Sequence, residues 1–269
     1  MLSLLTRIAE GKTIAEVWAT ATGHFARLGF ARVNYGFTLF RGPRSAVGDP
    51  DDALFLTTCD PAYAQFYFRN GFYSKTPAFR WTLNNVGACT WSWVRTAFLE
   101  GRLSPEEAET VRQNLAMGIV AGITVSFPES STRAKGAMGL IADPGLDPPT
   151  VDRIFAEKRD EIMTLAHVMH LRLTHLPFPT ARRPLTQRQR EALEWVADGK
   201  TTQDVALLMD ISPAMVEKHL RLAREALSVD TTAQAVAKAA LMNLIFIPDP
   251  ESPPELAAAT VLVALAPQL

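Results

Sequence analysis

The chain has 269 residues, of which 48% are hydrophobic and 20% charged, and a formal net charge of −1, which together indicate an ordinary globular protein with room for two folded units. No apolar run approaches the roughly 20 residues that cross a bilayer, and Arg7 and Glu10 interrupt the apolar start too early for a signal peptide, so a cytoplasmic protein is expected. Two cysteines, Cys59 and Cys89, are too few for a disulfide framework and too far apart for a metal site, and are expected to be free thiols.

Helices and strands follow one another irregularly over the first 173 residues. Apolar residues at helical spacing predict helices at 14–28, 61–70, 76–84, 104–116 and 148–173. Strand character is found at 31–41, 53–59, 88–94, 119–127 and 136–142. Several strands in short succession, bracketed by helices, indicate an α+β fold. We expect an α/β/α sandwich in which an antiparallel sheet is covered on both faces, with room for a pocket between sheet and helices.

Two proline-rich stretches divide the chain. Residues 174–184 contain three prolines and two adjacent arginines without apolar periodicity, which predicts an extended linker. The first domain is therefore expected to cover 1–173 and the second 185–247. The other stretch opens a C-terminal tail, 248–269. Its apolar part is interpreted as a docked terminal helix, with a partner-binding strip as the alternative.

Residues 185–247 predict a small all-α domain. The pairs Thr186/Gln189 and Thr201/Asp204 can each form a capping box, which starts a first and a second helix. After a short turn, Ser212 can cap a third helix, with proline at its first position. Two helices joined by so short a turn form a helix-turn-helix.

The third helix has one apolar and one polar face. Its predicted buried stripe consists of Val216, Leu220, Ala223 and Leu227. Residues 182–247 hold nine Lys and Arg against eight Asp and Glu, a balance of only +1, so any DNA contact depends on where the charges lie. The predicted DNA-binding residues are Lys218 and Arg221 on the open face, His219 and Arg224 on its flanks, and Thr201. The alternative is a plain solvated face on which Glu217 and Glu225 pair with neighbouring basic residues.

The segment 185–229 resembles the LuxR-type helix-turn-helix domain. It shares the Leu-Thr start, the Gly-Lys-Thr turn, the Ile-Ser cap, Val-x-x-His-Leu in the third helix and the final Leu-x-Val. The resemblance implies that the domain binds double-stranded promoter DNA and that a fourth helix, expected at 232–245, supports a homodimer. Some polar or basic contacts of the family are missing, because the chain departs from it at Gln189, Met215, Leu222, Ala226 and Thr232.

The first domain is similar to the autoinducer-binding domain of quorum-sensing regulators. The spacing that carries this similarity belongs to Tyr63, Tyr67, Thr76, Pro77, Trp91 and Gly122. The resemblance implies a pocket for an acyl-homoserine lactone, in which an aromatic donor contacts the lactone carbonyl, a carboxylate accepts the amide N–H and aromatic rings enclose the acyl chain. The ligand-binding residues that it implies are Cys59, Tyr63, Tyr67, Thr76 and Trp91.

Three substitutions lie where the family sets ligand specificity. Tyr63 stands in place of a Trp, Cys59 in place of a Tyr, and Thr76 in place of the Asp that receives the ligand amide. Because a neutral hydroxyl accepts a weaker hydrogen bond than a carboxylate does, we expect a lactone to be held less tightly. Without the family spacing, the same aromatic residues would be interpreted as core.

Metal and phosphoacceptor sites are the other candidates. His167, His170 and His175 have a suggestive spacing, but only the first two share a helix face and no cysteine or carboxylate accompanies them convincingly. Asp51 and Asp52 resemble the acidic pair of a receiver domain, yet they precede a strand instead of following one. Neither a metal nor a cofactor is therefore expected.

These observations predict a dimeric LuxR-type regulator with no catalytic activity. Its expected partners are promoter DNA, a small amphipathic signal, a second copy of the chain and RNA polymerase, but no membrane. Two alternatives stay open. One is a solo regulator whose pocket is filled by its own side chains or by a non-lactone metabolite, and the other is an enzyme or lipid-binding module that has gained a DNA-binding tail. Identification of a co-purified ligand would separate the ligand-controlled regulator from the solo regulator. Turnover of that ligand would support the enzyme.

Overall fold

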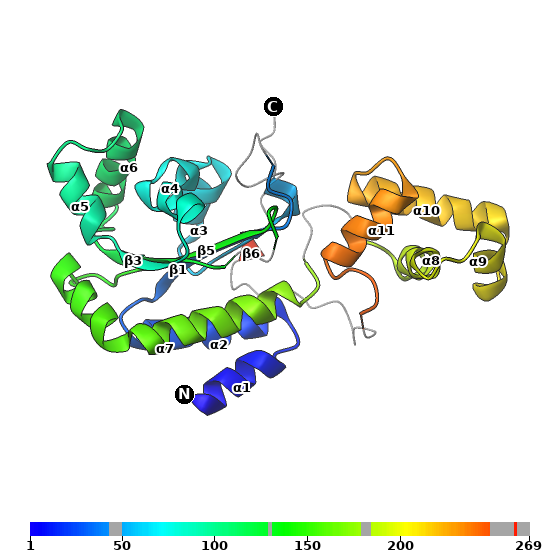
Figure 1. Cartoon of the computed structure of the whole chain (residues 1–269), viewed down its shortest axis with the longest axis horizontal. Coiled ribbons are helices and arrows are strands. Elements are labelled where there is room, and N and C mark those ends of the chain that lie inside the picture. Colours follow the sequence, from blue (N-terminus) through cyan, green and yellow to red (C-terminus); the bar gives the residue numbers. More distant parts are fainter. Residues whose placement is uncertain (43–49, 129–130, 179–183, 248–260, 263–269) are drawn as a thin grey trace. The chain divides into compact units, whose positions relative to one another are not determined.

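The computed structural model describes residues 1–42, 50–128, 131–178, 184–247 and 261–262 (Figure 1). These residues form two compact units, of which the first contains Met1–Thr174 and the second begins at His175. Residues 179–183 of the predicted linker, and all of the predicted tail except 261–262, lie outside the described residues.

The first unit is built on one antiparallel sheet with the strand order β3-β4-β5-β1-β2-β6. The strands are β1 (Arg32–Thr38), β2 (Ala53–Thr57), β3 (Gly87–Thr90), β4 (Gly122–Ser126), β5 (Lys135–Ile141) and the short β6 (Val261–Leu262). The central strand β1 pairs with β2 on one side and with β5 on the other. The predicted antiparallel sheet is confirmed.

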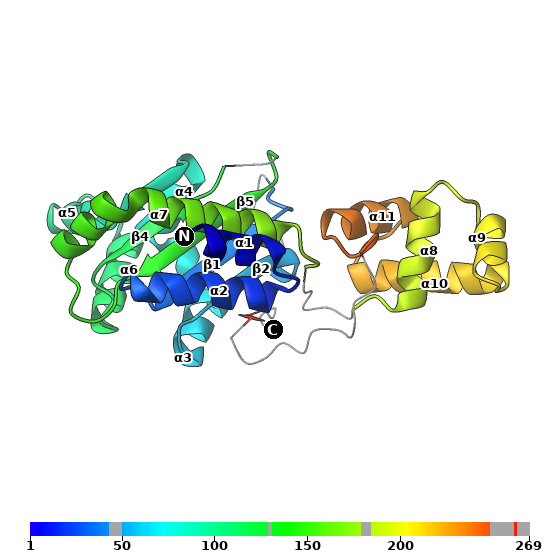
Figure 2. The same ribbon diagram turned by 90° about the horizontal axis from the view of Figure 1, so that it is seen from below.

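One face of the sheet is covered by the helices α1 (Leu2–Glu10), α2 (Ile14–Arg27) and α7 (Pro148–Thr174). Figure 1 shows these helices beneath the sheet, and Figure 2, viewed from below, shows the three side by side in front of it. The predicted apolar stripe of α2 is buried here, with Val17, Trp18, Ala21 and Phe25 at most 1% exposed. Burying one large aliphatic or aromatic side chain contributes about 1.5–3 kcal/mol, so this stripe is a main source of stability.

His170 belongs to this packed face. Its ring stacks on Phe127 with 4.0 Å between the centroids, and its Nδ1 lies 2.8 Å from the Tyr35 hydroxyl. Burial lowers the pKa of His170 to about 4, so the ring is neutral at pH 7, and one of its nitrogens can accept a hydrogen bond. His167 meets the same Phe127 ring edge to face. Aromatic packing therefore accounts for the spacing of these two histidines.

The other face of the sheet carries α3 (Pro61–Ala64), α4 (Pro77–Asn84), α5 (Ser92–Leu99) and α6 (Pro105–Ala116) (Figure 1). A π turn (Gln65–Arg69) and a 3-10 turn (Phe72–Lys75) connect α3 to α4. The helices on both faces confirm the predicted α/β/α sandwich. Because β1 residues alternate between the two faces, Tyr35 points to α7 whereas Asn34 points to the layer of α3 to α6.

Several local predictions were wrong. The predicted strand 88–94 ends at Thr90, and the residues after it form α5, which the sequence did not predict. The predicted helix 61–70 is four α-helical residues followed by the π turn. Helix α1 was also missed, and the described part of the tail, expected as a helix, is the strand β6 paired with β2.

The second unit contains α8 (Gln187–Ala197), α9 (Thr202–Leu208), α10 (Pro213–Leu227) and α11 (Thr232–Leu241). The capping boxes predicted at Thr186 and Thr201 are present, and the Ser212 hydroxyl accepts from the Met215 amide. The predicted stripe of α10 is buried among α8, α9 and α11. The helix-turn-helix is thus confirmed, although α11 ends at Leu241 and not near 245.

Among the described residues, no helix combines the length and apolar character that crossing a membrane requires.

Candidate functional site

A cavity lies between the sheet and the helices α3 to α6. It consists of two adjoining spaces of about 100 and 420 Å³, whose walls share Asn34, Tyr67, Ala78, Trp91 and Gly139. The smaller space follows β1, β2 and β5, where Phe37, Phe55 and Met138 contribute to its wall. The larger space extends to α5 and α6, and its apolar wall includes Val94, Phe98, Leu99, Val111, Leu115, Ile119 and Ile141. An apolar space with a few polar groups is typical of small-molecule sites.

Four of the five predicted ligand-binding residues line the larger space. These are Tyr63, Tyr67, Thr76 and Trp91. Cys59 does not line it. Its thiol donates to Asn34 Oδ1 at 3.6 Å, and it lies beside a separate cavity of about 330 Å³ together with Arg32 and Met117. The structure therefore brings the four aromatic and hydroxyl residues together and leaves Cys59 behind the wall that Tyr63 forms.

Tyr63 and Tyr67 form one side of the cavity. They are four residues apart, and their rings stack with centroids 5.4 Å apart. Burial raises the pKa of both phenols well above the ordinary value of 10. Both hydroxyls therefore stay protonated at neutral pH and can donate a hydrogen bond to a ligand oxygen.

Trp91 is held in place by the sheet. Its indole Nε1 donates to Thr124 Oγ1 at 2.8 Å, and its backbone N–H donates to the Gly122 carbonyl at 2.9 Å. A side chain at Gly122 would meet the Trp91 ring at 2.8 Å, so the glycine creates the space that the indole fills. Because the indole proton is engaged by Thr124, Trp91 offers the cavity the surface of its ring.

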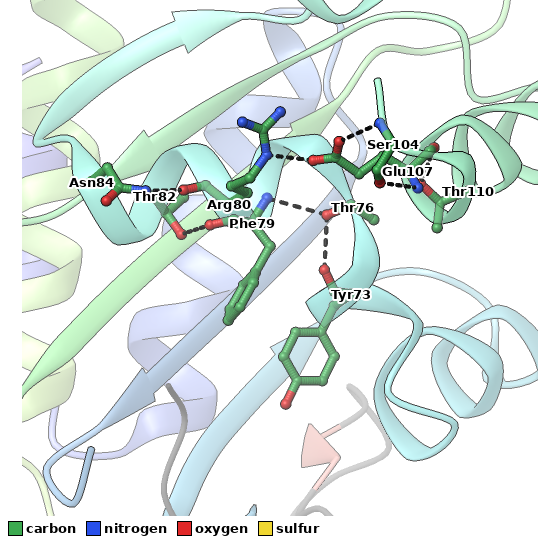
Figure 3. Close-up of polar contacts among 9 residues, drawn as sticks. All are labelled: Tyr73, Thr76, Phe79, Arg80, Thr82, Asn84, Ser104, Glu107 and Thr110. Carbon is green, nitrogen blue, oxygen red and sulfur yellow. Dashed lines mark hydrogen bonds and ion pairs between the residues drawn. The ribbon is translucent and has the colours of Figure 1, made fainter. Parts of the chain in front are cut away.

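Thr76 has a structural task at the start of α4. Its hydroxyl accepts from the Phe79 amide at 3.2 Å and donates to the Tyr73 carbonyl at 2.8 Å, as the dashed lines in Figure 3 show. Thr76 is 5% exposed and is the N-cap residue of α4. The side chain expected to receive a ligand amide therefore already binds two backbone groups.

Other polar residues of the cavity were not predicted. Asn34 lies in both walls and Arg95 and Asn114 lie in the wall of the larger space. A polar residue at a buried strand position could have pointed to Asn34. Arg95 and Asn114 had no such signal, because Arg95 directly follows the segment predicted as a strand and Asn114 falls on the helix predicted at 104–116.

The predicted DNA-binding residues of α10 differ in their surroundings. Lys218 and Arg221 are exposed on the face opposite the buried stripe, and Arg221 forms an ion pair with Glu225 one turn further on. An exposed pair of this kind contributes at most about 1 kcal/mol, so it can open when another anion is near. His219 is half-buried. The open face thus carries two cations that a phosphate or a base edge could reach.

Arg224 and Thr201 are engaged within the unit. The Arg224 guanidinium donates to Thr232 Oγ1 at 2.9 Å, which ties α10 to the start of α11. The Thr201 hydroxyl donates to the Asp204 carboxylate at 2.7 Å and caps α9. The angle between α9 and α10 is supported by another bond, from the Thr202 hydroxyl to Glu217 at 2.9 Å. Arg224 and Thr201 therefore stabilise the helix-turn-helix itself.

Comparisons with known proteins match two parts of the chain to two families. Residues 13–173 match the family described as autoinducer binding domain, and residues 183–239 match bacterial regulatory proteins of the luxR family. The transcriptional activator protein AnoR of Acinetobacter nosocomialis is 21% identical over 90% of this chain and 97% of its own length. The quorum sensing-dependent transcriptional regulator RpaR of Rhodopseudomonas palustris is 32% identical, over 44% of this chain and 40% of its own length.

The crystal structure of Escherichia coli SdiA has a similar fold. It superposes with a TM-score of 0.53 at 20% sequence identity and covers 91% of this chain and 98% of SdiA. This likeness extends the fold comparison over both units. With an autoinducer binding domain followed by a helix-turn-helix, the chain belongs to the luxR family of bacterial regulatory proteins.

Proposed function

We propose that the protein is a ligand-controlled transcriptional regulator that binds an acyl-homoserine lactone in the cavity of the first unit and promoter DNA through α10. The observation that carries this proposal is the cavity of about 420 Å³ in the autoinducer binding domain, with two protonated phenols in its wall. The phenols of Tyr63 and Tyr67 would donate to the lactone or acyl carbonyl, and Trp91 would cover the ligand with its ring. The related protein RpaR is named as a quorum sensing-dependent regulator, which supports this assignment.

Promoter DNA would be contacted by the exposed face of α10. Lys218 and Arg221 are the proposed direct contacts, with His219 on the flank. Arg224 and Thr201, predicted from the sequence as contacts, would act mainly by holding α10 against its neighbours. We further propose that the regulator acts as a homodimer, engages RNA polymerase at its promoters and works in the cytoplasm, where bacterial DNA is found.

Ligand and DNA binding would be coupled through stability. A ligand that binds only the folded first unit stabilises it by RT ln(1 + [L]/Kd), which is about 2.7 kcal/mol at a hundredfold excess over Kd. Such a gain can decide what fraction of the chains is folded and able to bind DNA. No step of this mechanism needs catalysis.

A second candidate is a regulator that senses a non-lactone metabolite. The engagement of Thr76 with Phe79 and Tyr73 favours it, because the hydroxyl expected to receive a lactone amide already makes two hydrogen bonds to the backbone and carries no charge. The other form of this alternative, a pocket filled by the protein's own side chains, is not supported, since the larger space has a volume of about 420 Å³.

The test combines ligand identification with DNA selection. The full chain is purified from cells that make no lactone, incubated with a lactone series, washed and extracted for mass spectrometry. The same protein, with and without the retained compound, then selects binding sites from random DNA duplexes. Retention of a lactone together with ligand-dependent selection of one sequence supports the proposal. Retention of an unrelated metabolite from the expressing cells, with no lactone bound, would favour the second candidate.

A further inference from the structure

The part of the cavity wall that α5 and α6 contribute is largely apolar. Val94, Phe98, Val111 and Leu115 make up much of it. Asn114 lies among them, near the C-terminal end of α6. Its side-chain oxygen is buried and has no hydrogen-bond partner within the described part of the chain. Because a buried oxygen without a donor destabilises the folded state, an asparagine at this place calls for a reason other than stability.

The fold itself does not use the Asn114 carboxamide. Helix α6 ends through backbone bonds alone, since the Met117 and Ile119 amides donate to the main-chain carbonyl of Asn114 at 3.1 and 2.8 Å. Any other side chain at this position would allow the same two bonds. By contrast, the side-chain oxygen of Asn34 accepts from the Thr57 hydroxyl at 2.6 Å and is part of the internal hydrogen bonding. The Asn114 side chain is therefore available to a molecule in the cavity.

The Asn114 carboxamide can present its oxygen to the cavity at little cost. The last torsion of an asparagine side chain is broad and roughly two-fold, so a half-turn exchanges the oxygen and the nitrogen. No hydrogen bond from the described residues holds the oxygen where it is. A ligand N–H that meets this oxygen supplies the donor that the protein does not provide.

Other acceptors in the cavity walls gain less from a ligand N–H. The Thr76 hydroxyl already accepts from the Phe79 amide at 3.2 Å, so its remaining lone pair would only add a second bond to an oxygen that has one. The Asn34 oxygen already accepts from two neighbours. Asp147 is exposed, so a ligand there would replace a bond to water. Asn114 differs from these three because its buried oxygen begins without a donor.

We propose that Asn114 is the residue that reads the amide N–H of the ligand, in the role that the sequence pattern assigns to Thr76. The inference rests on the proposed function, since it concerns the ligand of the same cavity. The protonated phenols of Tyr63 and Tyr67 donate to the ligand carbonyls, and Asn114 accepts from the N–H. This set of donors and acceptor fits an acyl amide, the class to which acyl-homoserine lactones belong.

The test uses two probes that differ in one group. N-octanoyl-homoserine lactone carries an amide, and α-octanoyloxy-γ-butyrolactone carries an ester oxygen in place of the N–H. Dissociation constants for both are measured on the full chain by calorimetry at pH 7. Both probes have the same carbonyl groups, so the ratio of the two constants reports on the N–H. The native protein should prefer the amide by about tenfold or more, because the ester leaves the Asn114 oxygen without a donor.

Two variants of Asn114 separate its oxygen from the rest of the side chain. Asn114→Leu removes the acceptor and should lower the amide-to-ester ratio by about tenfold. Asn114→Asp keeps an acceptor of the same shape, so its ratio should be at least as large as that of the native protein. Differences in hydration between the probes cancel when the ratio is compared between proteins. A ratio measured within one protein also does not depend on how much of that protein is folded.

Two further variants are the controls. Thr76→Val removes the hydroxyl at the position that the sequence pattern favours, and it should leave the amide-to-ester ratio within about twofold of the native value. Gln113→Leu makes a similar change one residue before Asn114. The Gln113 side chain donates to Glu109 at 3.0 Å and is not part of the cavity walls, so this variant should also keep the native ratio.

The outcomes distinguish the inference from the proposed function. If both probes bind and Asn114→Leu has the native ratio, the inference is overturned and the lactone function stands. A native protein that binds both probes equally overturns it as well. A fall of the ratio in Thr76→Val alone would return the role to Thr76. Failure of the native protein to bind either probe refutes the proposed lactone function and the inference with it.

Discussion

The substitution Gly122→Ala tests how the cavity wall is built. Strand β4 passes Trp91 with no room for a methyl group, since a Cβ at Gly122 would lie 2.8 Å from the indole ring. The same Cβ would lie 2.5 Å from the Leu140 carbonyl oxygen, and β5, which contains Leu140, is paired with β4 along its length. Both contacts are far shorter than real carbon contacts, so the alanine must displace the indole and spread the two strands.

The expected cost follows from overpacking. Inserting a methyl group into a packed site destabilises a protein by about 1–3 kcal/mol. For a domain of this size, each kcal/mol lowers the melting temperature by about 2–4 °C, so the first unit should melt about 2–12 °C earlier. The matched control is Gly139→Ala, since a Cβ there would lie 3.9 Å from the same Trp91 ring, an ordinary contact. By restricting the unfolded chain, the control should be neutral or stabilising by up to about 1 kcal/mol.

Thermal unfolding followed by tryptophan fluorescence measures both variants, and a lactone titration reports the displacement of Trp91. We expect Gly122→Ala to lower both the melting temperature and the ligand affinity. Equal melting temperatures for Gly122→Ala and the native protein would refute the packing argument. A loss of stability in Gly139→Ala as large as in Gly122→Ala would show that any side chain in these strands is harmful, whatever its contact with Trp91.

Three other predictions concern charge and hydrogen bonding. If Arg221 contacts a base, Arg221→Ala should weaken binding to the selected DNA by about 1–3 kcal/mol in mobility-shift assays. Arg188 is an exposed cation on α8, and the control variant Arg188→Ala should leave this binding unchanged. Arg224→Ala should lower the free energy of unfolding of the second unit by about 1–2 kcal/mol through loss of the bond to Thr232; an unchanged urea midpoint would contradict this. Burial lowers the pKa of His170 from 6.5 to about 4. Between these pH values the unfolded state therefore binds more protons than the folded state. We expect the free energy of unfolding to fall by about 3 kcal/mol in total as the pH falls through this window. The free energy of unfolding is measured against pH for the native protein and for His170→Phe, and the difference between the two curves gives the contribution of His170. A difference that does not vary with pH would show that His170 does not cause the loss of stability.

The second unit could be predicted from the sequence almost completely because its signals are local. A capping box joins residues three apart, and a helical stripe repeats every three or four residues. The boxes at Thr186 and Thr201 and the buried position of Val216 therefore followed from the printed order of residues. What could not be predicted is the partner of Arg224, since the bond to Thr232 depends on how α11 returns to α10.

The first unit was predicted less accurately where tertiary contacts decide the local structure. The segment Thr90 to Val94 is rich in residues that favour strands. Its strand ends at Thr90, because the Trp91 amide bonds to the Gly122 carbonyl and the Trp91 carbonyl accepts from the Val94 amide to start α5. The residues near Trp91 in the sequence do not indicate that its amide bonds to Gly122 or that Gly122 lies against its ring. The strand β6 is a similar case, since its pairing with β2 joins residues about two hundred positions apart.

In the candidate site, a local sequence signal and a contact known only from the structure both concern Thr76. The spacing that placed Thr76 on the cavity wall could be found in the sequence, and so could the preference of threonine for the start of a helix that begins with proline. The sequence does not say that a single oxygen must serve both purposes. Only the structure shows that oxygen bound to Phe79 and Tyr73, with its neighbouring acceptors Asn34 and Thr124 also engaged. The hydrogen bonds that the cavity can offer a ligand therefore depend both on which residues line it and on which of their atoms already bind other groups of the protein.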